Sequence, residues 1–240
     1  MLELKIISVK SAELQSNPKV VPAYPIALAA VITNGQGFNM KAHLKELSPF
    51  EGSEPHSHEL LIINESFYIE DRVNEIDPDA WYEQGTSLLS ETERPYVNYR
   101  DIFDQNKLPD GRWKARGCTI YRVLEAALTE AGFPKIHNML NHCTLANCFL
   151  RPALNGNSLN PKQIDVDIAK EYLVEFVERL KPKLIICASS NAYYAVVRDL
   201  KFDCPVVHTS HPVSVWWNRD GGKCGRTKFI NSIKETLFKT

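Results

Sequence analysis

The feature that most constrains the fold is a pair of short, almost continuous apolar runs with polar residues on either side. They cover Glu59 to Ile63 and Lys183 to Ala188. Runs of this length are typical of strands that are covered on both faces, as in a parallel sheet between helices. Because helical patterns lie between and after them, we predict an α/β fold with three α/β/α layers around a central, mainly parallel sheet.

Helix and strand signals alternate along the rest of the chain. We predict helices over about 119–131, 166–180, 191–200 and 227–238, and further strands near 143–149 and 205–208. Residues 67 to 114 are aromatic, charged and poorly periodic, which predicts long loops over the sheet edge. Earlier in the chain the pattern is weak, with a short strand over 2–9 and a short helix over 40–47 as the only expectations.

Length and composition narrow the class of protein. The chain has 240 residues, which suits one α/β domain over 1–240, with 1–50 as an N-terminal elaboration and 59–240 as the core. A formal charge of −1 counts against strong nonspecific binding of nucleic acid, although a local basic patch remains compatible with it. The six cysteines are scattered, no early run is long enough to span a membrane, and the first residues lack an export signal. We therefore expect a cytoplasmic protein with reduced thiols and no membrane partner.

Candidate functional residues lie where the predicted strands end, because ligands of parallel sheets bind at the carboxyl ends of strands. His211 follows the last strand, and Pro212 stiffens its turn. A histidine there can donate a hydrogen bond to a carbonyl that gains negative charge. Asn147 presents a donor and an acceptor side by side, as needed to read a pyrimidine edge. A structural histidine and a turn asparagine are the alternative interpretations.

Two further polar residues end the strand at 59–63. Glu65 could position a water molecule or stabilise a cationic sugar during glycosidic cleavage. Asn64 could orient water but could not act as a base at neutral pH. Taken alone, Glu65 is better interpreted as a solvated loop acid. The three strand ends together carry more information than any one of them.

The segment after His211 offers surface contacts. Trp216 and Trp217 stand in tandem, and either could fill the gap left by an extruded nucleotide or stack on single-stranded bases, although at least one is expected to cover the core. The glycine-rich stretch 221–228 contains Lys223 and Arg226 and precedes a helix, which suggests a phosphate seat or a solvated basic turn.

The order of these motifs resembles the uracil-DNA glycosylase superfamily, and in particular its thermophilic-type, family 4-like branch. The resemblance is carried by Asn64-Glu65-Ser66-Phe67, by Leu145-Ala146-Asn147 with Arg151-Pro152 after it, and by the stretch from 172 to 191. His211-Pro212-Val213-Ser214 completes it. The C-terminal part of the resemblance extends from about Asn141 to the end of the chain. The first motif, at 64–67, departs from the family pattern because Asn64 replaces a glycine and a following Pro-Gly is absent.

The resemblance implies a fold and a site. It implies a uracil-DNA glycosylase-like fold, DNA as partner, and a nucleotide that is flipped into a pocket at the strand ends. Glu65, Asn64 and His211 would be catalytic, Asn147 and the ring of Phe67 would hold the base, and Tyr68 is expected to pack in the core. DNA contacts would come from Ser189, Ser214, Trp216, Trp217, Lys223 and Arg226. The branch's iron-sulfur cluster needs spaced cysteines that this chain lacks, so we expect no cluster, no metal and no other cofactor.

The leading hypothesis is thus an enzyme that hydrolyses the N-glycosidic bond of uracil or another deaminated or modified base in DNA. The altered first motif leaves a catalytically inactive nucleic-acid- or nucleotide-binding protein open. A protein-interaction module is a third interpretation, which rests on the near-neutral charge and on the aromatic segment from Trp81 to Trp113. Base specificity, strand preference and oligomeric state do not follow from the sequence.

Overall fold

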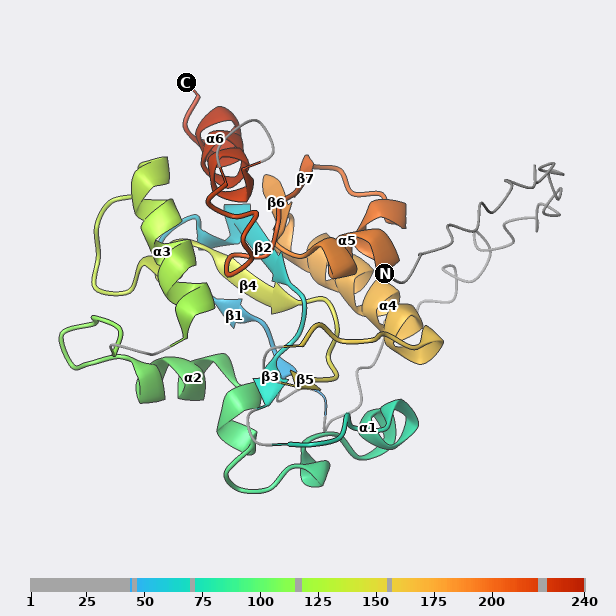
Figure 1. Ribbon diagram of the computed structural model, residues 1–240. Coiled ribbons are helices and arrows are strands. Elements are labelled where there is room, and N and C mark those ends of the chain that lie inside the picture. The colour runs from blue at the N-terminus through green and yellow to red at the C-terminus, as the bar shows by residue number, and fades with distance from the viewer. Residues whose placement is uncertain are drawn as a thin grey trace, which may run out of the picture. The chain divides into compact units, whose positions relative to one another are not determined.

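A sheet of five strands forms the centre of the computed structural model (Figure 1), which describes residues 44, 47–69, 72–114, 118–154, 157–219 and 224–239. The strand order is β1-β4-β2-β6-β7. The strands are β1 (Phe50–Glu51), β2 (Leu60–Asn64), β4 (Thr144–Asn147), β6 (Leu184–Cys187) and β7 (Val206–His208). β2, β4, β6 and β7 run parallel, and β1 pairs antiparallel with β4. A small second sheet pairs β3 (Tyr68–Ile69) with β5 (Ala153–Leu154) in parallel.

Helices cover both faces of the large sheet. The α-helices of the described residues are α1 (Pro78–Gln84), α2 (Tyr99–Asn106), α3 (Thr119–Ala131), α4 (Gln163–Leu180), α5 (Ser190–Ala195) and α6 (Gly225–Leu237). Short 3-10 helices are η2 (Ser57–Glu59), η3 (Gly85–Leu88), η4 (Arg94–Val97), η5 (Met139–His142) and η6 (Val197–Asp199). From β2 to β4 the chain moves toward the β1 edge of the sheet, and from β4 to β6 it moves back toward the β7 edge. Right-handed crossovers therefore place α3 on one face and α4 and α5 on the other. α6 packs beside α3 (Figure 1).

The central strands are apolar because both of their faces are covered. Every residue of β2, β4 and β6 is buried. This confirms the prediction of an α/β fold with a mainly parallel sheet and helices around it.

Several predicted boundaries agree closely with the structure. α3 covers the predicted range and ends at Gly132, whose φ of 111° lies in the left-handed region that favours glycine. α4 begins three residues before the predicted start, because the Asp165 carboxylate accepts from the Lys162 backbone N–H and stabilises an earlier first turn. The predicted helix over 191–200 is instead α5 followed by η6, with a break at Val196.

The prediction of long loops over 67–114 is wrong. This segment contains β3, α1, α2 and two 3-10 helices. Each α-helix is only seven or eight residues long, too short for a clear apolar period, and each starts from a capping side chain. Asp77 caps α1 just before Pro78, and Asn98 caps α2. The strand expected at 2–9 and most of the helix expected at 40–47 lie outside the described residues.

The strand order fixes where a ligand would bind. The connections that leave β2 and β6 turn to opposite faces of the sheet, and these two strands are neighbours. In open α/β sheets this reversal leaves a crevice at the carboxyl ends of the two strands. Residues 64–66 and 188–190 follow those ends.

Candidate active site at the carboxyl edge of the sheet

Glu65 and Ser189 meet at this reversal point. The Ser189 hydroxyl donates to Glu65 Oε2 at 2.8 Å, and the backbone N–H of Leu159 donates to Oε1 at 2.8 Å. Glu65 is only 3% exposed, so a carboxylate is held beneath the surface by two donors from distant segments. A carboxylate fixed in this way can face a developing positive charge without first being reoriented.

His211 follows β7 and carries a buried donor. The Val213 backbone N–H lies 3.4 Å from Nδ1, so Nδ1 is the acceptor and the neutral ring has its proton on Nε2. Nε2 is buried and has no protein partner. Burial lowers the pKa of the ring, and the negative charge of Glu65 partly offsets that shift. The site therefore contains a neutral imidazole whose Nε2–H is available to a ligand.

Asn64 and Asn147 lie side by side at the ends of neighbouring strands. Their Cα atoms are partners in the β2–β4 register, so both side chains point to the same face of the sheet. They are 4% and 3% exposed, neither carboxamide forms a hydrogen bond of normal geometry, and Asn64 lies close to the Tyr99 hydroxyl. Burying an amide without a partner costs free energy that a bound ligand can recover.

The carboxyl edge also gathers most of the unpartnered polar groups of the described structure. Nine of the thirteen buried side-chain nitrogen and oxygen atoms without a partner belong to residues that follow β2, β4 or β7 or end them. These residues are Asn64, Ser66, Asn147, Thr209, Ser210, His211 and Ser214. Such groups are rare in native interiors, and their concentration at one edge indicates a site for a polar ligand.

Phe67 was expected to hold the base and Tyr68 to pack in the core, but the structure places them the other way round. The Phe67 ring is 2% exposed and packs on Tyr99, with ring centroids 4.9 Å apart. Tyr68 is half-buried, and its ring meets the His211 ring edge-on at 6.2 Å. Burial raises the pKa of Tyr68, and the charge of Glu65 raises it further. Tyr68 is therefore the aromatic side chain beside His211, whereas Phe67 belongs to the core.

The tandem tryptophans also have different surroundings. Trp216 is 49% exposed, and the Arg219 guanidinium lies 4.4 Å from its ring centroid. Trp217 is completely buried and packs on Phe229. The loop from 213 to 216 thus presents one indole to solvent, next to the exposed Val213 and Val215.

At the start of α6, the described groups that were expected to contact phosphate have protein partners. The backbone N–H of Gly225 donates to the Trp216 carbonyl, that of Arg226 to the Trp217 carbonyl, and that of Thr227 to the Cys224 thiol. The Arg226 side chain forms an ion pair with Glu130 of α3. The amides and guanidinium proposed for phosphate therefore have protein partners, and Lys223 lies outside the described residues.

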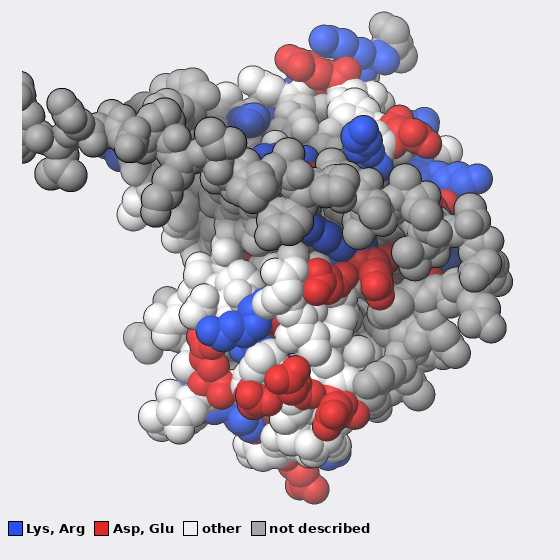
Figure 2. All heavy atoms as spheres, turned by 90° about the vertical axis from the view of Figure 1, so that its right-hand side faces the viewer, with Lys and Arg blue, Asp and Glu red and all other residues white. Residues whose placement is uncertain are grey.

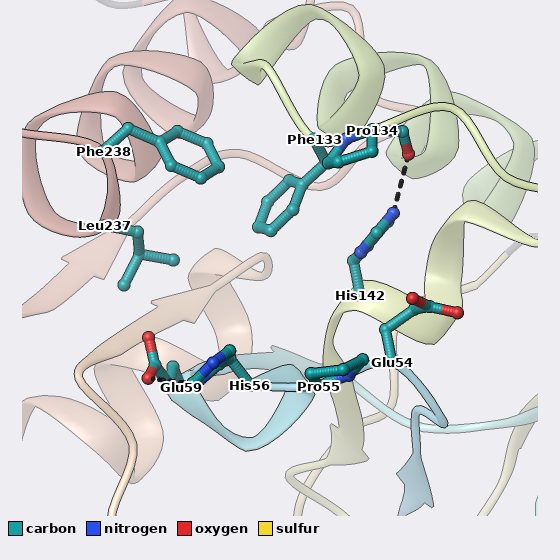
Figure 3. Close-up of a pocket in the computed structure, with 9 residues that line it drawn as sticks. All are labelled: Glu54, Pro55, His56, Glu59, Phe133, Pro134, His142, Leu237 and Phe238. Carbon is teal, nitrogen blue, oxygen red and sulfur yellow. Dashed lines mark hydrogen bonds and ion pairs between the residues drawn. The ribbon is translucent and has the colours of Figure 1, made fainter.

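Two concave pockets lie away from this edge. Figure 3 shows one of about 320 Å³ at the opposite, amino end of the sheet, with Phe133, Leu237 and Phe238 above His56 and Glu59. Its polar groups are largely paired: His142 Nε2 bonds the Pro134 carbonyl, and Glu59 bonds His56 and Lys183. The other, of about 660 Å³, is lined by residues from 110–113, α3 and 135–139. Neither contains the unpartnered groups of the carboxyl edge.

Charge on the visible surface is mixed. In the face that Figure 2 turns to the viewer, acidic side chains gather toward the lower end, where α1 lies, with basic groups among them. Exposed acids in and just before α1 are Glu75, Asp77, Asp79 and Glu83. This end of the face is unsuited to a DNA backbone.

In the described parts of the chain, no group of three or more His, Cys, Asp or Glu side chains could hold a metal ion, and all six cysteines are free thiols. No helix among the same residues is long and apolar enough to cross a membrane.

Some members of the site could be found from the sequence and others could not. Asn64, Glu65, Asn147, Ser189 and His211 follow from the strand ends, and the structure brings them to one edge. The backbone N–H of Leu159 has no sequence signal, because it reaches Glu65 across 94 residues.

No protein-family model matches the chain, and comparison with the curated proteins gives no significant match.

Proposed function

We propose that the protein is a DNA glycosylase-like enzyme of the uracil-DNA glycosylase type, which hydrolyses the N-glycosidic bond of uracil or another deaminated or modified base. The observation that carries this proposal is that a buried carboxylate held by two donors and a buried, unpartnered histidine Nε2 both lie at the carboxyl edge of the sheet. N-glycosidic cleavage needs a negative group near the sugar and a donor near the departing base.

On the base side, the unpartnered groups suit a flipped nucleobase. The Asn147 carboxamide offers a donor and an acceptor to the polar edge of the base. His211 Nε2–H donates to a base carbonyl oxygen as the C1′–N bond breaks and its electron pair moves onto the base. A neutral imidazole serves here because the base, and not the histidine, takes the developing charge.

On the sugar side, Glu65 faces the C1′ centre as it gains oxocarbenium character. Water attacks C1′, and its proton is lost while the freed base takes up a proton, which leaves an abasic sugar and the base as products. Asn64, which ends β2 directly before Glu65, orients that water. The exposed Trp216 fills the gap in the stack that the flipped nucleotide leaves.

A noncatalytic nucleic-acid-binding protein on this fold is the second candidate. The observation that favours it is that each oxygen of Glu65 already accepts a protein hydrogen bond, as in a purely structural carboxylate. In the aromatic segment that suggested a protein-interaction module, Trp81, Tyr82, Tyr99 and Phe103 are buried and Trp113 is half-buried, so most of these rings pack in the core.

The test is base release from single- and double-stranded oligonucleotides that carry uracil, hypoxanthine or xanthine. We expect wild type to release at least one base, and Glu65→Gln and His211→Ala each to lower the rate by about 10²-fold or more. Glu54→Gln, a carboxylate at the amino end of the sheet, is the matched control and should match wild type. Binding of DNA without release by wild type supports the second candidate, and absence of both rejects both.

A further inference from the structure

One loop holds the Glu65 carboxylate from below. Residues 157–162 lead into α4, and within them the Leu159 N–H donates to Glu65 Oε1 at 2.8 Å. The Leu159 side chain is 2% exposed, so this part of the loop is packed into the protein. The direction of the carboxylate therefore depends on how firmly this stretch of backbone is held.

Two side chains hold the carbonyls on the C-terminal side of that N–H. Asn191 of α5 donates from Nδ2 to the Leu159 carbonyl at 2.7 Å. Arg151 donates from Nη2 to the Asn160 carbonyl at 3.1 Å. With consecutive carbonyls fixed, rotation about the Leu159 backbone bonds is restricted, and the N–H stays on Glu65.

The loop is also tied to the start of α4. Arg151 and Asp165 are fully buried and joined by two hydrogen bonds, of 3.0 and 2.7 Å. Asp165 Oδ2 also accepts from the Lys162 N–H at 2.8 Å. Arg151 is thus a structural anchor whose removal would disturb the core, whereas Asn191 is half-buried and makes a single contact with the loop.

Residues at the start of α5 contact both oxygens of the Glu65 carboxylate, one directly and one indirectly. Ser189 reaches Oε2 directly, and Asn191, two residues later, reaches Oε1 through Leu159. We propose that Asn191 is a positioning residue for Glu65, and that it acts by holding the Leu159 peptide against the carboxylate. The proposal rests on the proposed function for its effect on catalysis, but the positioning itself can be measured without any substrate.

A matched pair of variants separates positioning from simple structural support. Asn106, at the end of α2, also donates from Nδ2 to a backbone carbonyl, that of Ile102 at 2.8 Å, and it is likewise half-buried. Asn191→Ala and Asn106→Ala therefore each remove one amide-to-carbonyl hydrogen bond. Ser189→Ala, which removes a direct donor to Glu65, is the positive control.

The experiment follows hydrogen exchange of the Leu159 backbone amide by NMR in the full chain, together with base release. An amide that stays in its hydrogen bond is protected from exchange, so loosening that bond speeds exchange. We expect the Leu159 amide to exchange faster in Asn191→Ala and at the wild-type rate in Asn106→Ala. Base release by Asn191→Ala and by Ser189→Ala should fall about tenfold or more.

The outcomes are distinct. A Leu159 amide exchange rate in Asn191→Ala that equals the wild-type rate, or that rises equally in Asn106→Ala, overturns the positioning role. A selective rise in exchange without base release by any form, wild type included, supports the positioning role and rejects the proposed function. A selective rise accompanied by slower release supports both.

Discussion

At the scale of the residue, His211 is held in a form that resists protonation. Because burial lowers its pKa below the ordinary value of 6.5, the unfolded chain binds more protons than the folded chain as the pH falls through that value. We predict that the free energy of unfolding decreases as the pH falls from about 7 toward the pKa of His211 in the folded protein. In the His211→Gln variant, the free energy of unfolding should decrease less over the same pH range. Burial also lowers the pKa of His208, so His208 contributes to the same pH dependence of stability, and this contribution remains in the His211→Gln variant. Denaturation at several pH values measures the difference, and an imidazole NMR titration with a pKa above 6.5 would contradict it.

At the scale of the element, α6 must begin with a glycine because the loop that carries His211 packs against it. A Cβ on Gly225 would lie 2.1 Å from Ser210 Oγ and 3.1 Å from Trp217 Cε3. Alanine is favoured over glycine in an isolated helix by about 1 kcal/mol, yet overpacking of this kind costs about 1–3 kcal/mol. We predict that Gly225→Ala lowers the free energy of unfolding, and that adding Ser210→Gly restores much of the loss. Urea denaturation tests this, and a Gly225→Ala protein at least as stable as wild type would show that the loop yields.

At the scale of the whole molecule, a buried polar network joins the segment 72–90 to α4. Asp165 pairs with Arg151 and accepts from the Tyr82 hydroxyl at 2.9 Å, and Arg151 donates to the Ile76 carbonyl at 3.1 Å. Removing the Asp165 charge leaves the buried Arg151 with only the longer, 3.6 Å ion pair to the part-exposed Glu75, so we predict that Asp165→Asn lowers the free energy of unfolding by about 3 kcal/mol. Asp110→Asn breaks the solvent-exposed pair with Arg112 and should leave the unfolding midpoint unchanged. Equal midpoints for the two variants would mean that the network contributes little.

The sequence by itself determined the α/β class, the bounds of α3 and the strand ends that carry Asn64, Glu65, Asn147 and His211. These features depend on local pattern, because an apolar run, a helical period or a glycine stop expresses itself within a few neighbouring residues. The same reasoning missed α1 and α2, since helices of seven or eight residues have too few turns to show a period.

Only the tertiary structure decided what each of those residues touches. Glu65 meets Ser189 across 124 residues and Leu159 across 94, contacts that no local pattern encodes. The same holds for the choice between neighbours of similar chemistry: Trp217 enters the core while Trp216 stays exposed, and Phe67 is buried while Tyr68 faces His211. Burial in such pairs depends on where distant helices pack, so it is fixed only when the sheet and its covering layers have assembled.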